Sequence, residues 1–475
     1  MPLVVGVDSS TSACKVQVRD VDTGALVASG RTVHSPTFPP RSEQQPSEWE
    51  QAFHAACADA ALPSTQAPCA ISIAAQQHGL VVIEDDGEVL RPAKLWNDTE
   101  SAPDAATLLG SLPGGPAAWA DACGSVPVPS FTITKLQWLR RNEPETFRRI
   151  AAVLLPHDWL TYRLTGRRTT DRGDASGTGY WSPREGRYRM DLLSLVSDDI
   201  DWGAALPDVL APEAVAGEWR GAGIPVAAGT GDNMAAALAL GLRPGDLALS
   251  LGTSGTACTV TDHAPADPTG TVAGFADATG RFLPLVCTMN ATKVTDTVAR
   301  LLGVDHAQFD ALALDASPGA GGLVLVPHLD GERTPNRPSA TGVLTGLRND
   351  ATPSQLARAA VEGVVCNLLA GAEALGPETV YGRVFLLGGA ARSRAYQRVV
   401  ADLTGRVVVV PTEDELVAAG AAVQAAAIHH GRDFARIAEA WGLGHGETVE
   451  PDDRVDRFAI RAAYAGAVAQ AGTAQ

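Results

Sequence analysis

The chain has 475 residues, of which 45% are hydrophobic and 19% charged, and its formal net charge at pH 7 is -17. This composition excludes a disordered or fibrous protein, and the acidic excess argues against nucleic acids and anionic membranes as partners. An anionic ligand would have to be held locally, by backbone NH groups, a metal ion and a few cations. The length predicts two or three domains, because a single core seldom grows past about 250 to 300 residues.

Cysteine usage and the apolar segments predict a cytoplasmic protein. The seven cysteines are scattered and include no Cys-x-x-Cys pair, which favours a reduced compartment and argues against a structural zinc site. The first residues enter an apolar strand directly, without the features of a secretion signal. No apolar stretch reaches the roughly 18 to 20 residues that span a bilayer.

Short apolar runs alternate along the chain with stretches rich in alanine and leucine. Such alternation predicts an α/β architecture, with strands at the apolar runs and helices between them. The Ala-rich segment 417–428 is expected to be a structural helix. The predicted strands are, in chain order, residues 3–7, 70–74, 226–228, 247–251, 384–387 and 406–410.

A turn crowded with small hydroxylated residues follows the first strand. It runs from Asp8 through Ser-Ser-Thr-Ser to a second, alternating strand that carries Lys15. The NH groups and hydroxyls of such a turn can bind phosphate oxygens, and Asp8 could hold Mg²⁺ through water. Taken alone, an ordinary hairpin with a capping aspartate explains this turn equally well.

A second turn of the same kind, residues 250–255, lies about 240 residues further along. Two such turns predict an internal duplication with one phosphate-facing hairpin in each half. The glycine- and proline-containing turn at 241–245 is the predicted boundary. We therefore expect an N-terminal domain at 1–243 and a C-terminal domain at 244–475, with the option that the last helix packs back on the first domain.

Asp232 follows an apolar strand and a Gly-Thr-Gly turn, at the start of a predicted helix. A carboxylate in this place can accept a proton from a substrate hydroxyl. Its spacing alone would also suit an N-cap aspartate, which satisfies backbone NH groups of the helix.

Taken together, four segments resemble the FGGY family of carbohydrate kinases. They are the hairpin at 8–15, Gly-Asp-Asn at 231–233, Ser-Leu-Gly-Thr-Ser-Gly at 250–255 and Leu-Gly-Gly-Ala at 387–390. Their order and spacing match the family over nearly the whole chain. The resemblance implies an α/β fold of two ribonuclease-H-like (actin-like ATPase) domains flanking a central cleft. It also implies a sugar kinase that uses ATP and Mg²⁺.

Further segments resemble the branch of the family that phosphorylates D-xylulose, at residues 76–79, 95–98, 155–159, 174–177 and 331–335. Gln77 stands where this branch commonly carries methionine, so the pocket wall becomes more polar. A lone histidine such as His78 is more often a core residue than a ligand contact, but its flanking residues match this branch. By the resemblance Asp232 is the catalytic base, and the sugar is bound by Gln77, His78, Trp96, Asn97, Asp232 and Asn233.

The resemblance also implies a nucleotide site, mainly on the second domain. Ser10 stands where the first turn of the family usually has glycine, and its Cβ narrows the approach to the γ-phosphate. Asp8 is the expected metal ligand. The residues expected to bind ATP are Thr11, Ser12, Lys15, Gly252, Thr253, Ser254, Asn367, Gly388, Gly389, Ala390 and Arg392.

The implied reaction transfers the γ-phosphoryl group of MgATP to the terminal hydroxyl of a ketopentose, with D-xylulose as the leading acceptor. One alternative keeps the kinase and changes the acceptor to ribulose, a sugar acid or a polyol. The other is a catalytically silent regulator that binds sugar or nucleotide. Retention of Asp8, Lys15, Asp232, Thr253 and Gly388 argues against this regulator. The expected partners are a small-molecule sugar and ATP; assembly as a homodimer is left open.

Overall fold

A computed structural model describes residues 2–62, 67–376 and 382–473 of the chain. The chain divides into two compact units, each built from separate segments. The first comprises Met1–Leu242, Asp262–Leu283 and Glu413–Gly444, and the second Arg243–Thr261, Pro284–Thr412 and His445–Gln475. The predicted boundary after residue 243 stays a prediction. Two helices from the C-terminal part of the chain, α15 (Leu416–His430) and α16 (Phe434–Trp441), also belong to the first unit, whereas the last helix, α17 (Arg457–Thr473), belongs to the second.

The main sheet of the first unit has the strand order β13-β14-β5-β1-β2-β3. Strand β1 pairs antiparallel with β2 and parallel with β5. A short extra strand, β15 (Thr230–Gly231), also pairs with β5. The strands are β1 (Leu3–Ser9), β2 (Ala13–Asp20), β3 (Leu26–Val33), β5 (Ala70–Ala75), β13 (Val215–Trp219) and β14 (Ile224–Ala227).

The second sheet repeats this pattern, with β24-β23-β22-β16-β17-β19 in place of β13-β14-β5-β1-β2-β3. Each pair of neighbours has the same sense as its counterpart in the first sheet. The predicted internal duplication is therefore confirmed. The strands are β16 (Leu247–Leu251), β17 (Gly255–Cys258), β19 (Phe282–Thr288), β22 (Val384–Leu387), β23 (Val408–Pro411) and β24 (Gly446–Val449).

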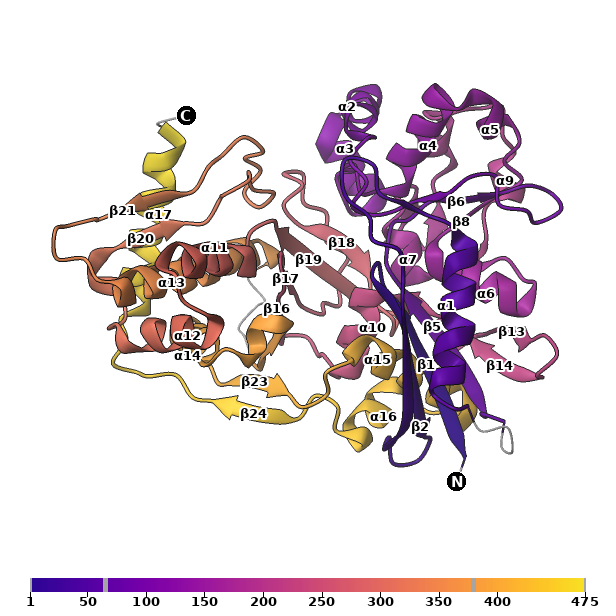
Figure 1. Ribbon diagram of the computed structural model, residues 1–475. Coiled ribbons are helices and arrows are strands. Elements are labelled where there is room, and N and C mark those ends of the chain that lie inside the picture. The colour runs from indigo at the N-terminus through magenta and orange to yellow at the C-terminus, as the bar shows by residue number, and fades with distance from the viewer. Residues whose placement is uncertain (1, 63–66, 377–381, 474–475) are drawn as a thin grey trace. The chain divides into compact units, whose positions relative to one another are not determined.

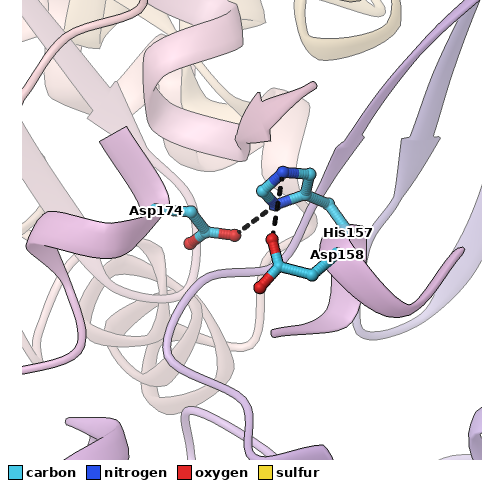
Figure 2. Close-up of side chains that lie close together, drawn as sticks. All are labelled: His157, Asp158 and Asp174. Carbon is cyan, nitrogen blue, oxygen red and sulfur yellow. Dashed lines mark hydrogen bonds and ion pairs between the residues drawn. The ribbon is translucent and has the colours of Figure 1, made fainter. Parts of the chain in front are cut away.

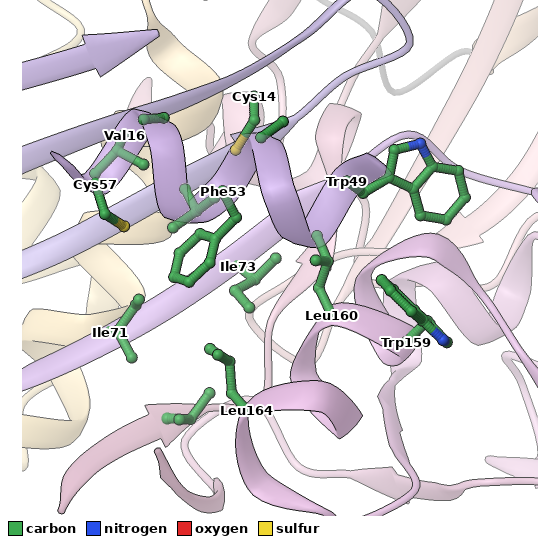
Figure 3. Close-up of a cluster of buried hydrophobic side chains, with 14 of the residues drawn as sticks. Cys14, Val16, Trp49, Phe53, Cys57, Ile71, Ile73, Trp159, Leu160 and Leu164 are labelled. Atoms are coloured by element: carbon green, nitrogen blue, oxygen red, sulfur yellow. The ribbon is translucent and has the colours of Figure 1, made fainter. Parts of the chain in front are cut away.

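The two faces of the first sheet follow from the alternation of side chains along its strands. Val5 and Val7 of β1 and Ile71 and Ile73 of β5 point to one face, where they pack with α1 (Pro46–Asp59) and α6 (Pro156–Thr165). Figure 3 shows this core, which includes Trp49 and Phe53 of α1 and Leu160 and Leu164 of α6. Burial of these apolar side chains holds the two helices on the sheet.

Helix α15 covers the opposite face of the same sheet. A Cβ added to Gly6 of β1 would lie 2.0 Å from the Ala418 carbonyl oxygen, so the helix backbone contacts the strand directly. Gly420 approaches α10 (Asp232–Ala239) as closely, because its added Cβ would lie 1.9 Å from the Ala235 carbonyl oxygen. The Ala-rich segment is thus a helix as predicted, and its small side chains permit this close packing.

The other helices and strands of the two units are labelled in Figure 1 where there is room. In the first unit they are β4 (Glu43–Gln44), β6 (Val81–Ile83), β7 (Ala93–Lys94), α2 (Ala102–Ser111), α3 (Gly115–Cys123), α4 (Thr132–Asn142), α5 (Pro144–Arg148), β8 (Ala152–Leu154), β9 (Thr169–Asp171), α7 (Arg172–Ser176), β10 (Trp181–Ser182), β11 (Arg187–Tyr188), α8 (Met190–Ser194), α9 (Trp202–Ala205), β12 (Asp208–Leu210) and β18 (Ala273–Ala276). In the second they are α11 (Thr292–Leu302), α12 (His306–Asp315), β20 (Val324–Val326), β21 (Val343–Thr345), α13 (Pro353–Ala372) and α14 (Arg394–Thr404).

Among the residues that the structure describes, no helix combines the length and the apolar character needed to cross a membrane.

Candidate functional site

The hydroxyl-rich turn of the first unit places a buried carboxylate beside a lysine. Asp8 lies near the end of β1 and is 3% exposed. Lys15 Nζ lies 3.4 Å from Asp8 Oδ2 and donates a 2.6 Å hydrogen bond to Glu415 Oε2. Burial raises the pKa of Asp8 to about 7, although Lys15 lowers it in part; the nearby charge of Asp232 adds to the increase. Asp8 and Asp232 are thus electrostatic neighbours.

The turn itself is closed by its own side chains. The Ser10 hydroxyl donates to the Ala13 carbonyl at 2.9 Å, so it is bound within the turn. The Thr11 hydroxyl donates to Gln76 Oε1 at 3.0 Å and accepts from the Trp96 indole NH at 2.9 Å. These bonds join the hydroxyl-rich turn to two segments, 76–79 and 95–98, that carry residues predicted to bind the sugar. Ser12 is exposed beside them.

Asp232 begins helix α10, and Gly231 holds the N-cap position, so the N-cap interpretation of Asp232 is wrong. Its Oδ1 accepts hydrogen bonds from the Asn233 backbone NH at 2.8 Å and from Asn233 Nδ2 at 2.9 Å. Asn233 Nδ2 also donates to Gln77 Oε1 at 3.0 Å. Burial raises the pKa of Asp232 to about 6, and the bonds from Asn233 limit the increase. The carboxylate is therefore ionised at neutral pH and remains basic enough to take a proton.

His78 adopts a backbone conformation that is unusual for a residue with a side chain, with φ of 65°. Its Nδ1 lies 2.7 Å from the Gly177 carbonyl oxygen, which only accepts, so this nitrogen carries a proton. The ring stacks on Phe131 with centroids 4.9 Å apart and contacts Phe275 at 5.5 Å. Backbone strain of this kind collects at functional sites, because the surroundings must hold it in place.

The Trp96–Asn97 loop rests on a buried salt-bridge network. Lys94, which is fully buried, lies 3.1 Å from Asp98, 2.7 Å from Glu100 and 3.2 Å from Glu43. Trp96, two residues further along the chain, is 39% exposed. The three acids could hold a metal ion by their spacing alone, but the Lys94 ammonium occupies their centre, so we interpret the cluster as structural.

Several polar atoms near these residues lack a protein partner. Across the described residues, no hydrogen bond satisfies Asp8 Oδ1, Gln76 Nε2, Gln77 Nε2 or Asn97 Oδ1, although all four atoms are buried. Buried polar atoms normally have partners, so such a group marks a place where a bound molecule would supply them. An unpaired carboxylate oxygen on Asp8 also fits Mg²⁺, which prefers oxygen ligands.

The hydroxyl-rich turn of the second unit joins β16 to β17. It is closed by a 3.0 Å bond from the Gly252 NH to the Ser254 carbonyl. The NH groups of Ala291 and Thr292 donate to the carbonyls of Thr253 and Gly252, at 3.1 and 2.9 Å. These bonds place the first residue of α11 beside the turn, where the positive end of the helix dipole favours an anion.

The Gly-Gly-Ala turn lies next to this hairpin. It follows β22, whose Leu387 pairs with Ser250 of β16. Gly388 has φ of 82°, and a Cβ added to it would lie 2.7 Å from the Leu251 carbonyl oxygen, so only glycine fits. A Cβ on Gly389 would meet nothing within 4 Å, which leaves its backbone open to a ligand. Ala390 is buried and Arg392 is exposed.

Asn367 is placed differently from the other predicted nucleotide residues. It is 1% exposed, and both ends of its amide are used within the protein. Its Oδ1 bonds to His328 Nε2 at 3.2 Å and accepts from the Tyr464 hydroxyl at 3.0 Å, while its Nδ2 donates to Glu332 Oε2 at 3.1 Å. Glu332 in turn accepts from the Asn290 amide at 2.9 Å. Asn367 therefore supports the 289–292 loop behind the turn, and its direct contact with a nucleotide stays a prediction.

Sequence reasoning missed the acidic partners of the site. Glu415 and Glu413 bind Lys15 and Arg19 from a segment almost 400 residues away, and no local pattern marks them. Glu332 lies in the segment 331–335 that was singled out, but only its buried contacts show what it does. His157 and Asp174 were singled out in the same way and form the cluster in Figure 2.

Two solved structures with the same fold are named as kinases. The xylulose kinase from Bifidobacterium adolescentis is 38% identical, with a TM-score of 0.87 over 98% of this chain and 99% of that chain. Gluconate kinase from Lactobacillus acidophilus is 21% identical and shows the fold alone, with a TM-score of 0.90 over 99% and 98% of the two chains. With its duplicated sheets and hydroxyl-rich turns, the protein has the actin-like ATPase fold of these kinases.

The chain belongs to the FGGY family of carbohydrate kinases. The model of the family's N-terminal domain matches residues 3–239, and that of its C-terminal domain matches residues 247–428. Among curated relatives, a xylulose kinase from Streptomyces rubiginosus is 49% identical over 474 residues, 96% of this chain and 95% of the relative. The predicted family and fold are confirmed.

Proposed function

We propose that the protein transfers the γ-phosphoryl group of ATP to D-xylulose and forms D-xylulose 5-phosphate. The observation that carries this proposal is the Asp232 carboxylate near Asp8 and the first hydroxyl-rich turn; it is held by Asn233, whose amide also donates to Gln77. The assignment of D-xylulose as the substrate is supported by the 49% identity with a relative named xylulose kinase.

Asp232 is the proposed base. It would accept the proton of the terminal sugar hydroxyl as the oxygen attacks phosphorus. Its pKa of about 6 suits this role, since the group is charged at pH 7 but is a stronger base than an ordinary aspartate. Asn233 fixes the carboxylate through two hydrogen bonds to one oxygen, which leaves the other oxygen for the sugar.

The sugar hydroxyls would be bound by the amides and rings around Asp232. Gln77 Nε2 and Asn97 Oδ1, which lack partners in the described part of the chain, would pair with hydroxyls. Trp96 would pack against the carbon skeleton, and His78 would present its ring from a fixed orientation. Pockets that bind hydroxyls by hydrogen bonds reject sugars that leave these groups unpaired.

Phosphate binding is proposed for both hydroxyl-rich turns. In the first unit, Asp8 would hold Mg²⁺, which neutralises phosphate charge when bound, while Lys15, Thr11 and Ser12 would contact phosphate oxygens. In the second unit, Gly252, Thr253 and Ser254 would bind phosphates. The Gly388 turn, with Gly389, Ala390 and Arg392, would border the adenosine. Asn367 would contribute indirectly, through Glu332, which binds the Asn290 amide in the 289–292 loop.

The test is ADP release from MgATP in the presence of D-xylulose, D-ribulose, L-ribulose, D-gluconate or glycerol, each supplied separately. We expect D-xylulose to give the highest kcat/KM. The matched control is Asp232→Asn, which keeps the shape and the hydrogen bonds of the side chain but removes its basicity. It should lower kcat by about 10² to 10⁴-fold.

A different leading acceptor would keep the kinase and change its sugar. That result would point to Gln77 as the residue that changes the sugar preference, because it stands where kinases that phosphorylate D-xylulose commonly carry methionine. Sugar binding without ADP release for any acceptor would contradict the proposal and favour a silent binding protein.

A further inference from the structure

A histidine in the first unit is enclosed by aspartates that the proposed reaction does not use (Figure 2). His157 Nδ1 lies 2.6 Å from Asp174 Oδ2, and its Nε2 lies 3.3 Å from Asp158 Oδ1 and 4.0 Å from Asp171 Oδ1. The histidine side chain is fully buried, and the three aspartates are at most 4% exposed. We call these residues, His157, Asp158, Asp171 and Asp174, the His157 cluster.

The charge of the cluster follows from its geometry. Nδ1 donates a hydrogen bond to Asp174 Oδ2, whereas Nε2 lies within ion-pair distance of Asp158 Oδ1 but forms no hydrogen bond with a described residue. Burial by itself lowers the pKa of His157, but the carboxylates of Asp158, Asp174 and Asp171 outweigh it and raise the pKa to about 10. Burial also raises the pKa of Asp158 and that of Asp174, the latter to about 7, so the ring and these carboxyl groups hold their protons as one coupled cluster. Removing the ring leaves its buried partners unpaired, which is costly.

The cluster is bonded to the loop that carries Asp232. The Thr230 hydroxyl donates to Asp171 Oδ2 at 2.7 Å. Gly229 packs directly on the histidine ring, since an added Cβ would lie 2.6 Å from His157 Cδ2. Residues 230 and 231 then pair with β5, and Asp232 follows immediately. The position of the Asp232 backbone is therefore set by Thr230 and Gly229.

The cluster also fixes the residue that holds His78. Asp171 caps α7 by accepting from the NH groups of Gly173 at 2.8 Å and Asp174 at 2.9 Å. This short helix ends at Ser176, and the carbonyl of its C-cap residue, Gly177, accepts the hydrogen bond from His78 Nδ1. A Cβ added to Gly177 would lie 2.6 Å from the same nitrogen, so a larger residue at position 177 would displace the His78 ring.

We propose that the His157 cluster is a positioning unit that sets the places of Asp232 and His78 together. It acts through the 229–231 loop on one side and through the Gly177 carbonyl on the other. This inference rests on the proposed function, in which Asp232 is the base and His78 binds the sugar. The residues of the cluster are positioning residues, because they reach the reacting groups only through these two connections.

The test compares His157→Gln with Leu164→Ala by steady-state kinetics on the full chain. Glutamine retains one hydrogen-bonding group but cannot carry the charge. We expect kcat to fall about 10 to 100-fold, since small displacements of reacting groups cost rate steeply. The KM for D-xylulose should rise severalfold while the KM for ATP stays unchanged. Leu164 lies on the same helix in the apolar core, so Leu164→Ala should lower the melting temperature and leave both KM values unchanged.

A second measurement does not depend on activity. Hydrogen exchange of residues 229–233 and 78 should become faster in His157→Gln and stay unchanged in Leu164→Ala. If no acceptor is phosphorylated by the unaltered chain, the proposed function fails, and this exchange still tests the positioning. Equal exchange and equal KM values in the two variants would overturn it. A stoichiometric metal ion that is lost in His157→Gln would also overturn it, because the ring would then be a metal ligand.

Discussion

At the residue scale, the site holds two carboxylates in surroundings that disfavour their charge. Burial raises the pKa of Asp8 to about 7 and that of Asp232 to about 6, well above the range of an exposed aspartate. Such groups destabilise the folded state at neutral pH. The protein retains them, which is expected where charge serves a reaction and not the fold.

Asp232→Asn should therefore be more stable than the unaltered chain at pH 8. The folded pKa of Asp232 lies above its unfolded value, so the folded state binds more protons and loses stability as pH rises from about 4 to about 6. Removing the charge should recover up to about 3 kcal/mol above pH 7 and nothing below pH 4. Melting temperatures across this pH range test the prediction. A lower melting temperature for Asp232→Asn at pH 8 would contradict it.

The sequence allowed Asp8, Lys15 and Asp232 to be predicted because each lies in a short motif whose chemistry is local. The pairing of Glu415 with Lys15 and the contacts of His157 could not be predicted from the sequence, because these side chains meet only after separate segments pack together. The contacts of Asn367 could not be predicted from the sequence either, because its partners come from two other segments: His328 and Glu332 from the loop after β20, and Tyr464 from α17.

At the element scale, the close contact between α15 and α10 decides where α10 lies. Gly420→Ala would push a Cβ to within 1.9 Å of the Ala235 carbonyl oxygen, and backbone cannot move aside cheaply. We expect a loss of about 1 to 3 kcal/mol, the usual cost of overpacking. Thermal unfolding measures it.

The same substitution at Gly466 is the control. Gly466 lies in α17, is exposed, and its added Cβ would meet nothing within 4 Å. Alanine is the better helix former, so Gly466→Ala should raise stability by up to about 1 kcal/mol. Similar effects of the two substitutions would show that helix propensity, and not the packing of Gly420, sets the stability.

The elements themselves were largely readable from the sequence. The strands at 247–251 and 384–387 have the predicted bounds, while the one expected at 406–410 lies at Val408–Pro411. Apolar runs mark strands well when both faces are buried, as for β16 and β22. The grouping of α15 with the first unit could not be predicted, because its alanines show no preference for one sheet over another.

At the scale of the whole molecule, the first unit is incomplete without residues 413–444. These residues supply α15, which covers one face of the sheet, and the glutamates that bind Lys15 and Arg19. A fragment of residues 1–242, which carries every strand of the first sheet, should therefore expose this face and aggregate. Co-expression with residues 413–444 should yield a soluble complex that unfolds cooperatively.

Co-expression with residues 445–475, which belong to the second unit, is the matched control and should not rescue the fragment. Circular dichroism and the melting profile of the purified material distinguish the outcomes. Cooperative melting of the fragment 1–242 alone would contradict the prediction.

The pairing of Lys15 with Glu415 also bears on how the chain folds during its synthesis. Ribosomes add about 5 to 20 residues each second, and the two partners lie 400 residues apart. The first sheet therefore waits on the order of 20 to 80 seconds for the helix that covers its second face. Through this interval the face of the first sheet that carries Gly6 is not covered by α15, so chaperones are expected to bind the nascent chain early and to release it only after α15 has been synthesised.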